Sequence, residues 1–235
     1  MRRRFFVERF ENKTAALSGD AAHHLGRVLR AEAGQFYELS DGKSAWLARI
    51  EKVGRERVDF SLIEPIASRE LAVETTLLLA VVKFDSFEWA LEKATELGVR
   101  TIVPLAAARS DKALLKAAEK RAERWKKTLL ESSQQSRRVS VPELKVLEKP
   151  ADAFKRATGL KIILTEKPEA VPLKRVLPSS ASKVTLAIGP EGGWTDEEFA
   201  TAQAAGFRQA SLGSLILRTE TAVVAALSNL NYALG

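Results

Sequence analysis

Apolar positions in the C-terminal two thirds of the chain follow two alternating patterns. The run TTLLLAVV (75–82) is continuously apolar, which is typical of a strand buried on both faces of a sheet. In the next segment Phe87, Leu91, Ala94 and Leu97 recur at helical spacing, and Gly98 marks the end. Strands alternating with helices predict an α/β domain with a mostly parallel sheet. Further strands are predicted at 100–105, 161–165, 184–188 and 208–212, and helices at 111–135, from Thr195 and from Thr219.

The first 70 residues instead alternate with a period of two, the pattern of half-buried strands. QFYELSDGKSAWLARIEK predicts two strands joined by a turn at Asp41 and Gly42. ERVDFSLIE alternates again, with Val58, Phe60 and Leu62 on one face. We therefore expect a small β-rich domain, with a barrel as one possible arrangement.

Two local features complete the predicted domain organisation. A short helix is expected within DAAHHLGRVLR (20–30), with Asp20 as its N-cap. The polar stretch 65–74 has no strong period and is interpreted as a linker. The predicted domains are therefore 1–70, which is β-rich, and 75–235, which is α/β.

Composition narrows the classes of protein that the chain can represent. Of its 235 residues, 46% are hydrophobic and 29% are charged, as in an ordinary soluble globular protein. No apolar stretch reaches the roughly 18 residues that would cross a bilayer, and the basic N-terminus lacks the apolar segment of a secretory signal. The chain has no cysteine, which excludes disulfides, thiolate metal ligands and cysteine nucleophiles. Because only His23 and His24 supply imidazole, we expect no metal site, and we expect a cytoplasmic protein.

The positive charge is concentrated in one segment. The net charge is +7, and residues 109–138 contain ten Lys and Arg against four Asp and Glu, a local surplus of six. Such a run can be a solvated helix face. A surplus of this size also favours a polyanionic partner, because Lys and Arg release counterions from phosphates. Charge therefore points to nucleic acid.

Three predicted strands are followed by segments with the composition of a site. In open α/β sheets ligands bind beyond the carboxyl ends of the strands. The first of these segments is LTEKPE (164–169), and the last is LGSLILR (212–218). The middle segment, GPEGGWTDEE (189–198), is the most informative.

In this middle segment Gly189, Gly192 and Gly193 allow the backbone to approach a ligand closely or to adopt a positive φ angle. Thr195 and Glu198 have the spacing of a capping box, so a helix is expected to begin there. A tight strand-to-helix turn without a ligand is the alternative. The chain has neither GxGxxG nor GxxxxGK[ST], so NAD and P-loop nucleotide binding lose their usual support.

The last predicted helix is apolar on more than one side. One face of the helix carries a stripe of apolar residues, and Val224 and Ala225 add apolar surface beside that stripe. This suggests that the sheet covers one side of the helix and another subunit covers the other. Burial in a single core is the alternative. Arg218 and Glu220 at its start are costly to bury unless they are paired, so they indicate either a function or a structural ion pair. The stripe consists of Ala222, Val223, Ala226, Leu227 and Leu230.

These motifs resemble a known family. GPEGGWTDEE followed by LGSLILRTETA is similar to the C-terminal signature of SPOUT methyltransferases of the RsmE type, which methylate N3 of a uridine in 16S ribosomal RNA. The resemblance covers nearly the whole chain, including KFDSFEWALEKATELGV and QQSRRVSVPEL. The chain departs from the family at Leu215, where a basic residue is usual, and at ESSQQ (131–135), where a more acidic segment is common.

The resemblance implies an N-terminal PUA-like β-barrel and a SPOUT α/β domain with a deep trefoil knot. It also implies a homodimer with S-adenosyl-L-methionine held in a bent form at the interface, and 16S ribosomal RNA or the small subunit as partner, with no membrane and no metal. The implied cofactor contacts are Leu164, Thr165, Ile188, Gly189, Gly193, Leu212, Gly213, Ile216, Leu217 and Thr221.

The same resemblance implies roles for charged residues. Arg218 would stabilise the negative charge that develops on the uridine oxygens, and Glu191 and Glu220 are candidates for a general base. The implied RNA-binding residues are Arg2, Arg3, Arg4, Arg27, Arg30, Lys83, Arg109, Arg137 and Arg138.

Two other functions fit parts of the sequence. A non-enzymatic RNA-binding assembly factor would explain the basic segment and the β-rich domain, although the glycine turn and ILRTETA argue against it. A SPOUT enzyme acting on another RNA would keep the cofactor segments, although the N-terminal match argues against that.

Overall fold

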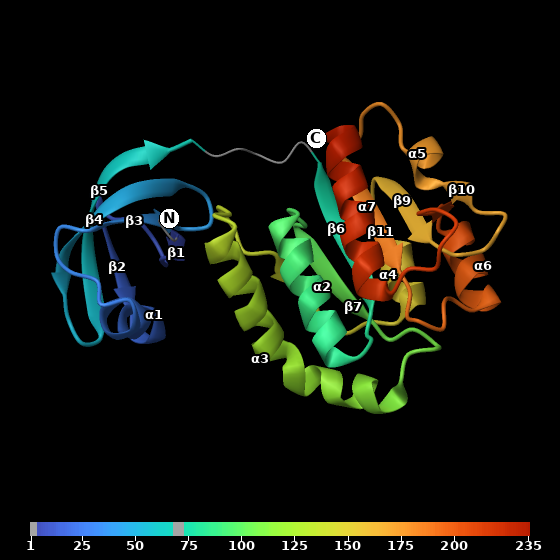
Figure 1. Cartoon of the computed structure of the whole chain (residues 1–235), viewed down its shortest axis with the longest axis horizontal. Helices are drawn as coiled ribbons and strands as arrows, with labels where there is room; N and C mark the ends of the chain where they lie inside the picture. The colour runs from blue at the N-terminus through green and yellow to red at the C-terminus, as the bar shows by residue number, and fades with distance from the viewer. Residues whose placement is uncertain (1–3, 68–72) are drawn as a thin grey trace. The chain divides into compact units, whose positions relative to one another are not determined.

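The computed structural model describes residues 4–67 and 73–235 (Figure 1). These residues divide into two compact units. The first contains the described residues up to position 67 together with Ser133–Val141, and the second contains the remainder. The predicted division assigned 133–141 to the second domain. In the structure Arg4 Nη1 donates to the carbonyl oxygen of Arg137 at 2.5 Å and Ser40 Oγ to that of Val139 at 2.6 Å, which joins this segment to the first unit.

The N-terminal unit contains a five-stranded sheet in the order β1-β3-β4-β5-β2. All pairs are antiparallel except β1 and β3, which run parallel. The predicted face of Val58, Phe60 and Leu62 is buried in the core of this unit. The period-two pattern therefore identified the buried side of the sheet correctly. The strands are β1 (Arg4–Phe6), β2 (Thr14–Ser18), β3 (Phe36–Ser40), β4 (Ala45–Val53) and β5 (Arg57–Ile66).

The hairpin predicted at Asp41 and Gly42 is confirmed. Strands β3 and β4 pair from Ser40 opposite Ala45, and Gly42 has a φ of +84°. The Asp41 carboxylate accepts hydrogen bonds from the backbone N–H groups of Lys43 and Ser44 at 2.9 and 2.8 Å. Partial burial raises the pKa of Asp41, and the hydrogen bonds lower it. The combined effect of the hydrogen bonds is larger, so the pKa of Asp41 lies below the ordinary 3.8.

We expect Asp41→Ala to lower the free energy of unfolding by about 1–2 kcal/mol near pH 7, because two backbone donors lose their acceptor. Since the folded pKa is depressed, this contribution is present above the unfolded pKa and is lost as pH falls through the folded pKa. Urea unfolding at neutral and acidic pH measures the difference. Asp20→Ala removes an exposed carboxylate and is the control. Equal losses in both variants would contradict this role of Asp41.

The short N-terminal helix begins earlier than predicted. Helix α1 (Gly19–His23) has Ser18 as its N-cap, so Asp20 lies in the first turn and the prediction that it caps the helix was wrong. Gly19 has a φ of +60°, which lets the chain turn directly from β2 into the helix. The helix continues as a π-helical turn, η1 (His24–Val28).

The predicted linker at 65–74 is shorter in the structure. Pro65 and Ile66 still belong to β5 and pair with Trp46 and Ala45 of β4. Glu74 already belongs to β6. Residues 68–72 lie outside the described part of the chain.

The C-terminal unit contains a seven-stranded sheet in the order β10-β12-β9-β11-β6-β7-β8. Its pairs are all parallel, which confirms the α/β prediction. The two-residue strands at its edges were not predicted. The strands are β6 (Glu74–Ala80), β7 (Thr101–Leu105), β8 (Glu143–Leu144), β9 (Leu160–Leu164), β10 (Val171–Pro172), β11 (Lys183–Ile188) and β12 (Arg208–Ser211).

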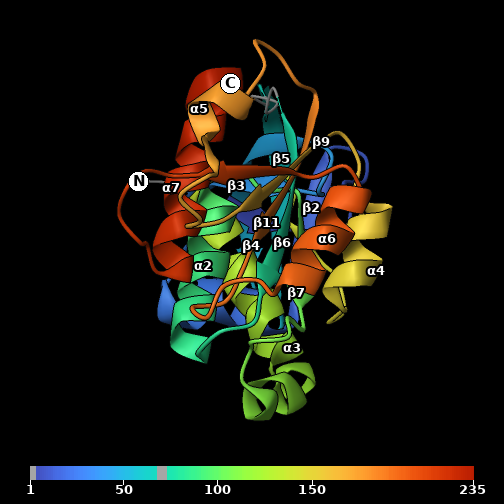
Figure 2. The ribbon, with the colours of Figure 1, turned by 90° about the vertical axis from the view of Figure 1, so that its right-hand side faces the viewer.

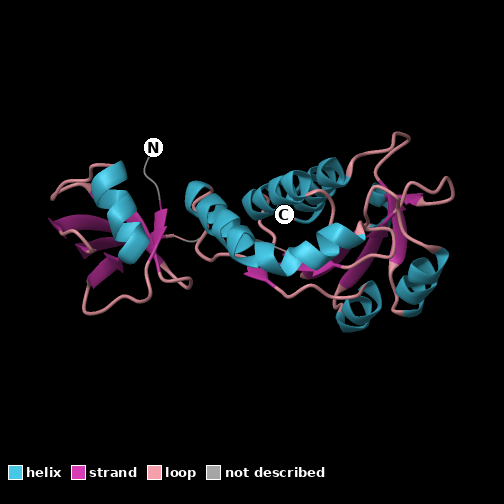
Figure 3. Ribbon diagram, turned by 90° about the horizontal axis from the view of Figure 1, so that it is seen from below, coloured by secondary structure: helices cyan, strands magenta, loops and turns pink. Residues whose placement is uncertain are grey.

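Helices cover both faces of this sheet (Figures 2 and 3). Helices α2 (Phe84–Glu96) and α7 (Thr219–Leu234) pack together on one face, and α4 (Pro150–Arg156) and α6 (Asp196–Ala204) pack together on the other. The long α3 (Lys112–Gln135) packs against α2 through Trp125, and α5 (Leu173–Val176) is a single turn. The sequence analysis predicted α2, α3, α6 and α7 but not the short α4 and α5.

Strand order brings the three candidate segments together. Strands β12, β9 and β11 are neighbours in the sheet, with Ala210 of β12 opposite Leu164 of β9. The segments that follow their carboxyl ends are the glycine turn and the two loops identified in the sequence. Among the described residues, none of the helices combines the length and apolar character needed to span a bilayer.

Candidate active site

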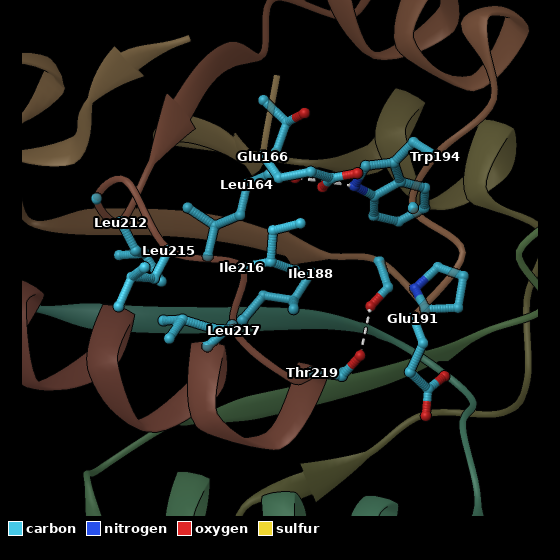
Figure 4. Close-up of a pocket in the computed structure, with 16 residues that line it drawn as sticks. Leu164, Glu166, Ile188, Glu191, Trp194, Leu212, Leu215, Ile216, Leu217 and Thr219 are labelled. Atoms are coloured by element: carbon cyan, nitrogen blue, oxygen red, sulfur yellow. Dashed lines mark hydrogen bonds between the residues drawn. The ribbon is translucent and has the colours of Figure 1, made fainter. Parts of the chain in front are cut away.

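An open pocket lies where these three strands end (Figure 4), and its empty space of about 770 Å³ includes open solvent at its mouth. The segments after β9, β11 and β12 line it together with the start of α7. Its lining residues are Leu164, Thr165, Glu166, Ile188, Gly189, Pro190, Glu191, Gly193, Trp194, Leu212, Gly213, Leu215, Ile216, Leu217, Thr219 and Ala222.

Nine of the ten predicted cofactor contacts line this pocket. The exception is Thr221, which is exposed in the first turn of α7. Thr219, two residues earlier, is buried, and its hydroxyl donates to the carbonyl oxygen of Gly189 at 3.0 Å. Because successive helical residues are about 100° apart, Thr221 faces a different direction.

The glycine turn is packed tightly. Gly193 has a φ of +68°, and a Cβ there would lie 2.9 Å from Oε1 of Glu166. A Cβ on Gly189 would lie 3.0 Å from the indole of Trp194, which is itself buried and donates from Nε1 to the carbonyl oxygen of Leu164 at 3.1 Å. Both positions therefore favour glycine for a structural reason.

The predicted capping box at the start of α6 is confirmed. The Thr195 side chain accepts from the N–H of Glu198, and the Glu198 carboxylate accepts from the N–H of Thr195. Glu198 also accepts from the N–H of Ala108 at 2.8 Å. One carboxylate thus holds the glycine turn, α6 and the segment after β7 in place.

One wall of the pocket is apolar and open to solvent. Leu215 is 81% exposed and Ile216 is 82% exposed, while Leu212 and Leu217 are half-buried. Adjacent aliphatic side chains with this much exposure usually mark a binding surface. The wall is suited to the flat face of an aromatic ligand.

Of the three predicted catalytic residues one lines the pocket, and the structure shows no ion pair between any two of them. Glu191 is the one that lines it. Arg218 directly follows the lining residue Leu217, is exposed, and has no ion pair among the described residues. Glu220 is half-buried in the first turn of α7. The burial cost anticipated for Arg218 therefore does not arise in the single chain, and its guanidinium is free to approach a ligand.

Most of the predicted RNA-binding residues in the described ranges are exposed, namely Arg27, Arg30, Lys83, Arg109 and Arg137. Arg109 donates to the carbonyl oxygen of Gly192 at 2.7 Å, which attaches it to the glycine turn. Arg138 is half-buried and donates to the carbonyl oxygen of Ser140.

Arg4 differs from this group. It is 5% exposed and forms an ion pair of 2.9 Å with Glu38, so the prediction of a phosphate contact is not supported by its position. The core of the N-terminal unit holds its guanidinium. Arg2 and Arg3 lie outside the described residues.

Sequence reasoning missed several lining residues: Glu166, Pro190, Trp194, Leu215, Thr219 and Ala222. Each lies within or beside a segment that the sequence had singled out. Only their side-chain directions were unknown. The tryptophan next to Gly192 and Gly193 was the one signal available in the sequence.

The sequence matches two family models. Residues 69–231 match a model described as RNA methyltransferase domain, and residues 17–63 match one described as RNA methyltransferase PUA domain. Two curated relatives are both named Ribosomal RNA small subunit methyltransferase E. The protein from Synechocystis sp. is 32% identical over 95% of this chain and 75% of its own length, and the protein from Bacillus subtilis is 29% identical over 97% and 96%.

A solved structure is similar over the full chain. The crystal structure of a Ribosomal RNA small subunit methyltransferase E from Neisseria gonorrhoeae, bound to S-adenosyl methionine, superposes with a TM-score of 0.91 at 29% identity. The alignment covers 100% of this chain and 99% of that one.

Proposed function

This chain belongs to the RNA methyltransferase family, and from that premise we propose that it transfers a methyl group from S-adenosylmethionine to N3 of a uridine in 16S ribosomal RNA. Its fold is a PUA-like N-terminal sheet joined to a SPOUT α/β domain. The deep knot that the resemblance implies stays a prediction. We also propose that the protein acts in the cytoplasm, where its ribosomal substrate would be found.

The main support for this proposal is that the segments following three neighbouring strands line one pocket. Its exposed aliphatic wall suits an adenine ring, and its glycine turn places backbone without side chains against the pocket at Gly189 and Gly193. Both features fit S-adenosylmethionine, which supplies an electrophilic methyl group on a sulfonium when bound. We assign the nine predicted lining residues to its binding.

The residues around the pocket suit the chemistry of the uridine. N3 must lose a proton, and the resulting negative charge spreads onto O2 and O4. Arg218 is an exposed cation without an ion pair among the described residues, and it lies between the lining residues Leu217 and Thr219, from where it would stabilise that charge. Glu191 lines the pocket and is the better placed of the two candidates for accepting the proton. The pocket walls mainly align the reactants.

RNA would be held by the exposed basic residues of each unit. Arg27 and Arg30 extend from the N-terminal unit, and Lys83 and Arg109 from the C-terminal unit. Phosphate contacts of this kind bind RNA without reading its sequence. The site of methylation would therefore depend on RNA shape and on the pocket.

The proposal is tested by incubating the protein with labelled S-adenosylmethionine and small ribosomal subunits that lack the modification, followed by nucleoside analysis. We expect label in 3-methyluridine of the 16S RNA. Label in a ribose methyl group or in transfer RNA would identify a different RNA methyltransferase. RNA binding without cofactor binding would identify an assembly factor.

We further propose that the protein is a homodimer. Leu215 and Ile216 are exposed, Val224 and Ala225 on α7 are only half-buried, and Tyr232 near the end of α7 is 93% exposed. A second copy would cover this apolar surface. The pocket would then lie at the interface between two copies.

Light scattering at micromolar concentration is expected to give about twice the chain mass of 25.8 kDa. The dimer buries apolar surface, so salt should leave its mass unchanged. A mass of one chain under these conditions would contradict the dimer.

A further inference from the structure

Glu166 is a charged residue of the pocket to which the function gives no role. It lies two residues beyond Leu164, the last residue of β9, and lines the pocket. Its Oε1 is 2.9 Å from the position that a Cβ on Gly193 would occupy, so the carboxylate lies directly over the glycine turn. Glu166 is exposed, and it makes no hydrogen bond or ion pair with any other described residue.

Three donors near Glu166 are already engaged elsewhere. The indole N–H of Trp194 donates to the carbonyl oxygen of Leu164, and the N–H of Gly193 donates to that of Pro190 at 2.8 Å. The neighbouring Lys167 pairs with Asp196 at 3.1 Å. The acceptor capacity of the Glu166 carboxylate is therefore left for a ligand.

The cofactor offers three kinds of donor: the two ribose hydroxyls, the α-ammonium group and the adenine amine. Figure 4 shows Glu166 across the pocket from Thr219, which directly follows Arg218. If Arg218 faces the reacting base, Glu166 lies away from the reacting end. The methionyl end also carries a carboxylate, which Glu166 would repel. Adjacent ribose hydroxyls present two donors to one carboxylate without such repulsion.

We propose that the Glu166 carboxylate binds the ribose hydroxyls of S-adenosylmethionine and is a positioning residue for the cofactor. The assignment rests on the proposed function. The ribose is unchanged when the methyl group leaves, so Glu166 binds cofactor and product equally. Its loss therefore raises the KM for the cofactor and leaves kcat nearly unchanged.

The test uses isothermal titration calorimetry with three ligands: S-adenosylmethionine, S-adenosylhomocysteine and 5′-methylthioadenosine, which keeps the ribose but lacks the amino acid. In Glu166→Ala we expect all three to bind roughly tenfold to a hundredfold more weakly than to wild type, as for a lost hydrogen bond to a charged group. Glu166→Gln should lose less affinity for these ligands than Glu166→Ala. Thermal stability should not change, because Glu166 is exposed and unpaired in the described structure.

Glu169→Gln is the matched control, because Glu169 is exposed in the same loop and does not line the pocket. Its affinity for all three ligands should equal that of wild type. A loss confined to the two ligands that carry the amino acid would assign Glu166 to the α-ammonium and overturn the ribose contact. Unchanged affinities in Glu166→Ala would overturn any contact. If wild type bound none of the ligands, the proposed function would fail, and this assignment with it.

Discussion

The Arg218→Ala protein is expected to methylate RNA about a hundredfold or more slowly than wild type at saturating cofactor and RNA. Arg218 is exposed, lies between the lining residues Leu217 and Thr219, and has no ion pair among the described residues. Its removal therefore deletes a cation that would face the developing oxyanion without breaking a structural contact. The measurement is single-turnover methyl transfer on small subunits, with unfolding monitored in parallel.

Two controls separate this chemistry from RNA binding and from folding. Arg27→Ala removes an exposed arginine of the N-terminal unit, and the salt dependence of RNA binding should flatten by roughly one unit of slope. Arg218→Ala should leave that slope nearly unchanged. A structural role would give the opposite pattern, with lost thermal stability or lost dimer but intact turnover per folded dimer. That result would remove Arg218 from the catalytic residues.

The Gly193→Val protein is expected to bind no S-adenosylmethionine at concentrations that saturate wild type. Gly193 has a φ of +68°, and its added Cβ would lie 2.9 Å from the Glu166 carboxylate, so the branched side chain would enter the pocket. The strained backbone should also cost about 1–3 kcal/mol of folding stability. Calorimetric titration of the folded variant measures the loss of binding.

Gly206→Val is the matched control for backbone strain. Gly206 has a φ of +85° in the turn after α6, and a Cβ there meets nothing within 4 Å. We expect a similar loss of stability in this variant with cofactor affinity preserved. Wild-type affinity in a folded Gly193→Val protein would show that the ligand does not approach the glycine turn.

The local patterns of the sequence were sufficient for the main elements of the fold. Period two placed Val58, Phe60 and Leu62 in the core of the N-terminal unit, and helical spacing located α2 and α7. The reason is that burial on one face imposes the period of the backbone on the side chains that follow it. Short elements such as α4, with only seven residues, carry too few positions for a period to be read.

Much of the candidate site was also accessible from the sequence. Ligands collect beyond the carboxyl ends of parallel strands, so the segments after β9, β11 and β12 could be named in advance. The family resemblance then selected residues within them, and nine of the ten line one pocket. Thr221 does not line this pocket, because its direction depends on where α7 begins, and the first residue of that helix, Thr219, is the one that bonds to Gly189.

Only the tertiary structure decided which side chains meet. The ion pair of Arg4 with Glu38 joins residues 34 positions apart, and Glu166 approaches Gly193 because their strands are neighbours in the sheet. The sequence by itself determined the longer elements, the two kinds of fold and the segments of the site, since these follow from local periodicity and from motifs. The burial of Arg4, the exposure of Arg218 and the unpaired carboxylate of Glu166 depend on contacts between distant segments, which no local pattern records.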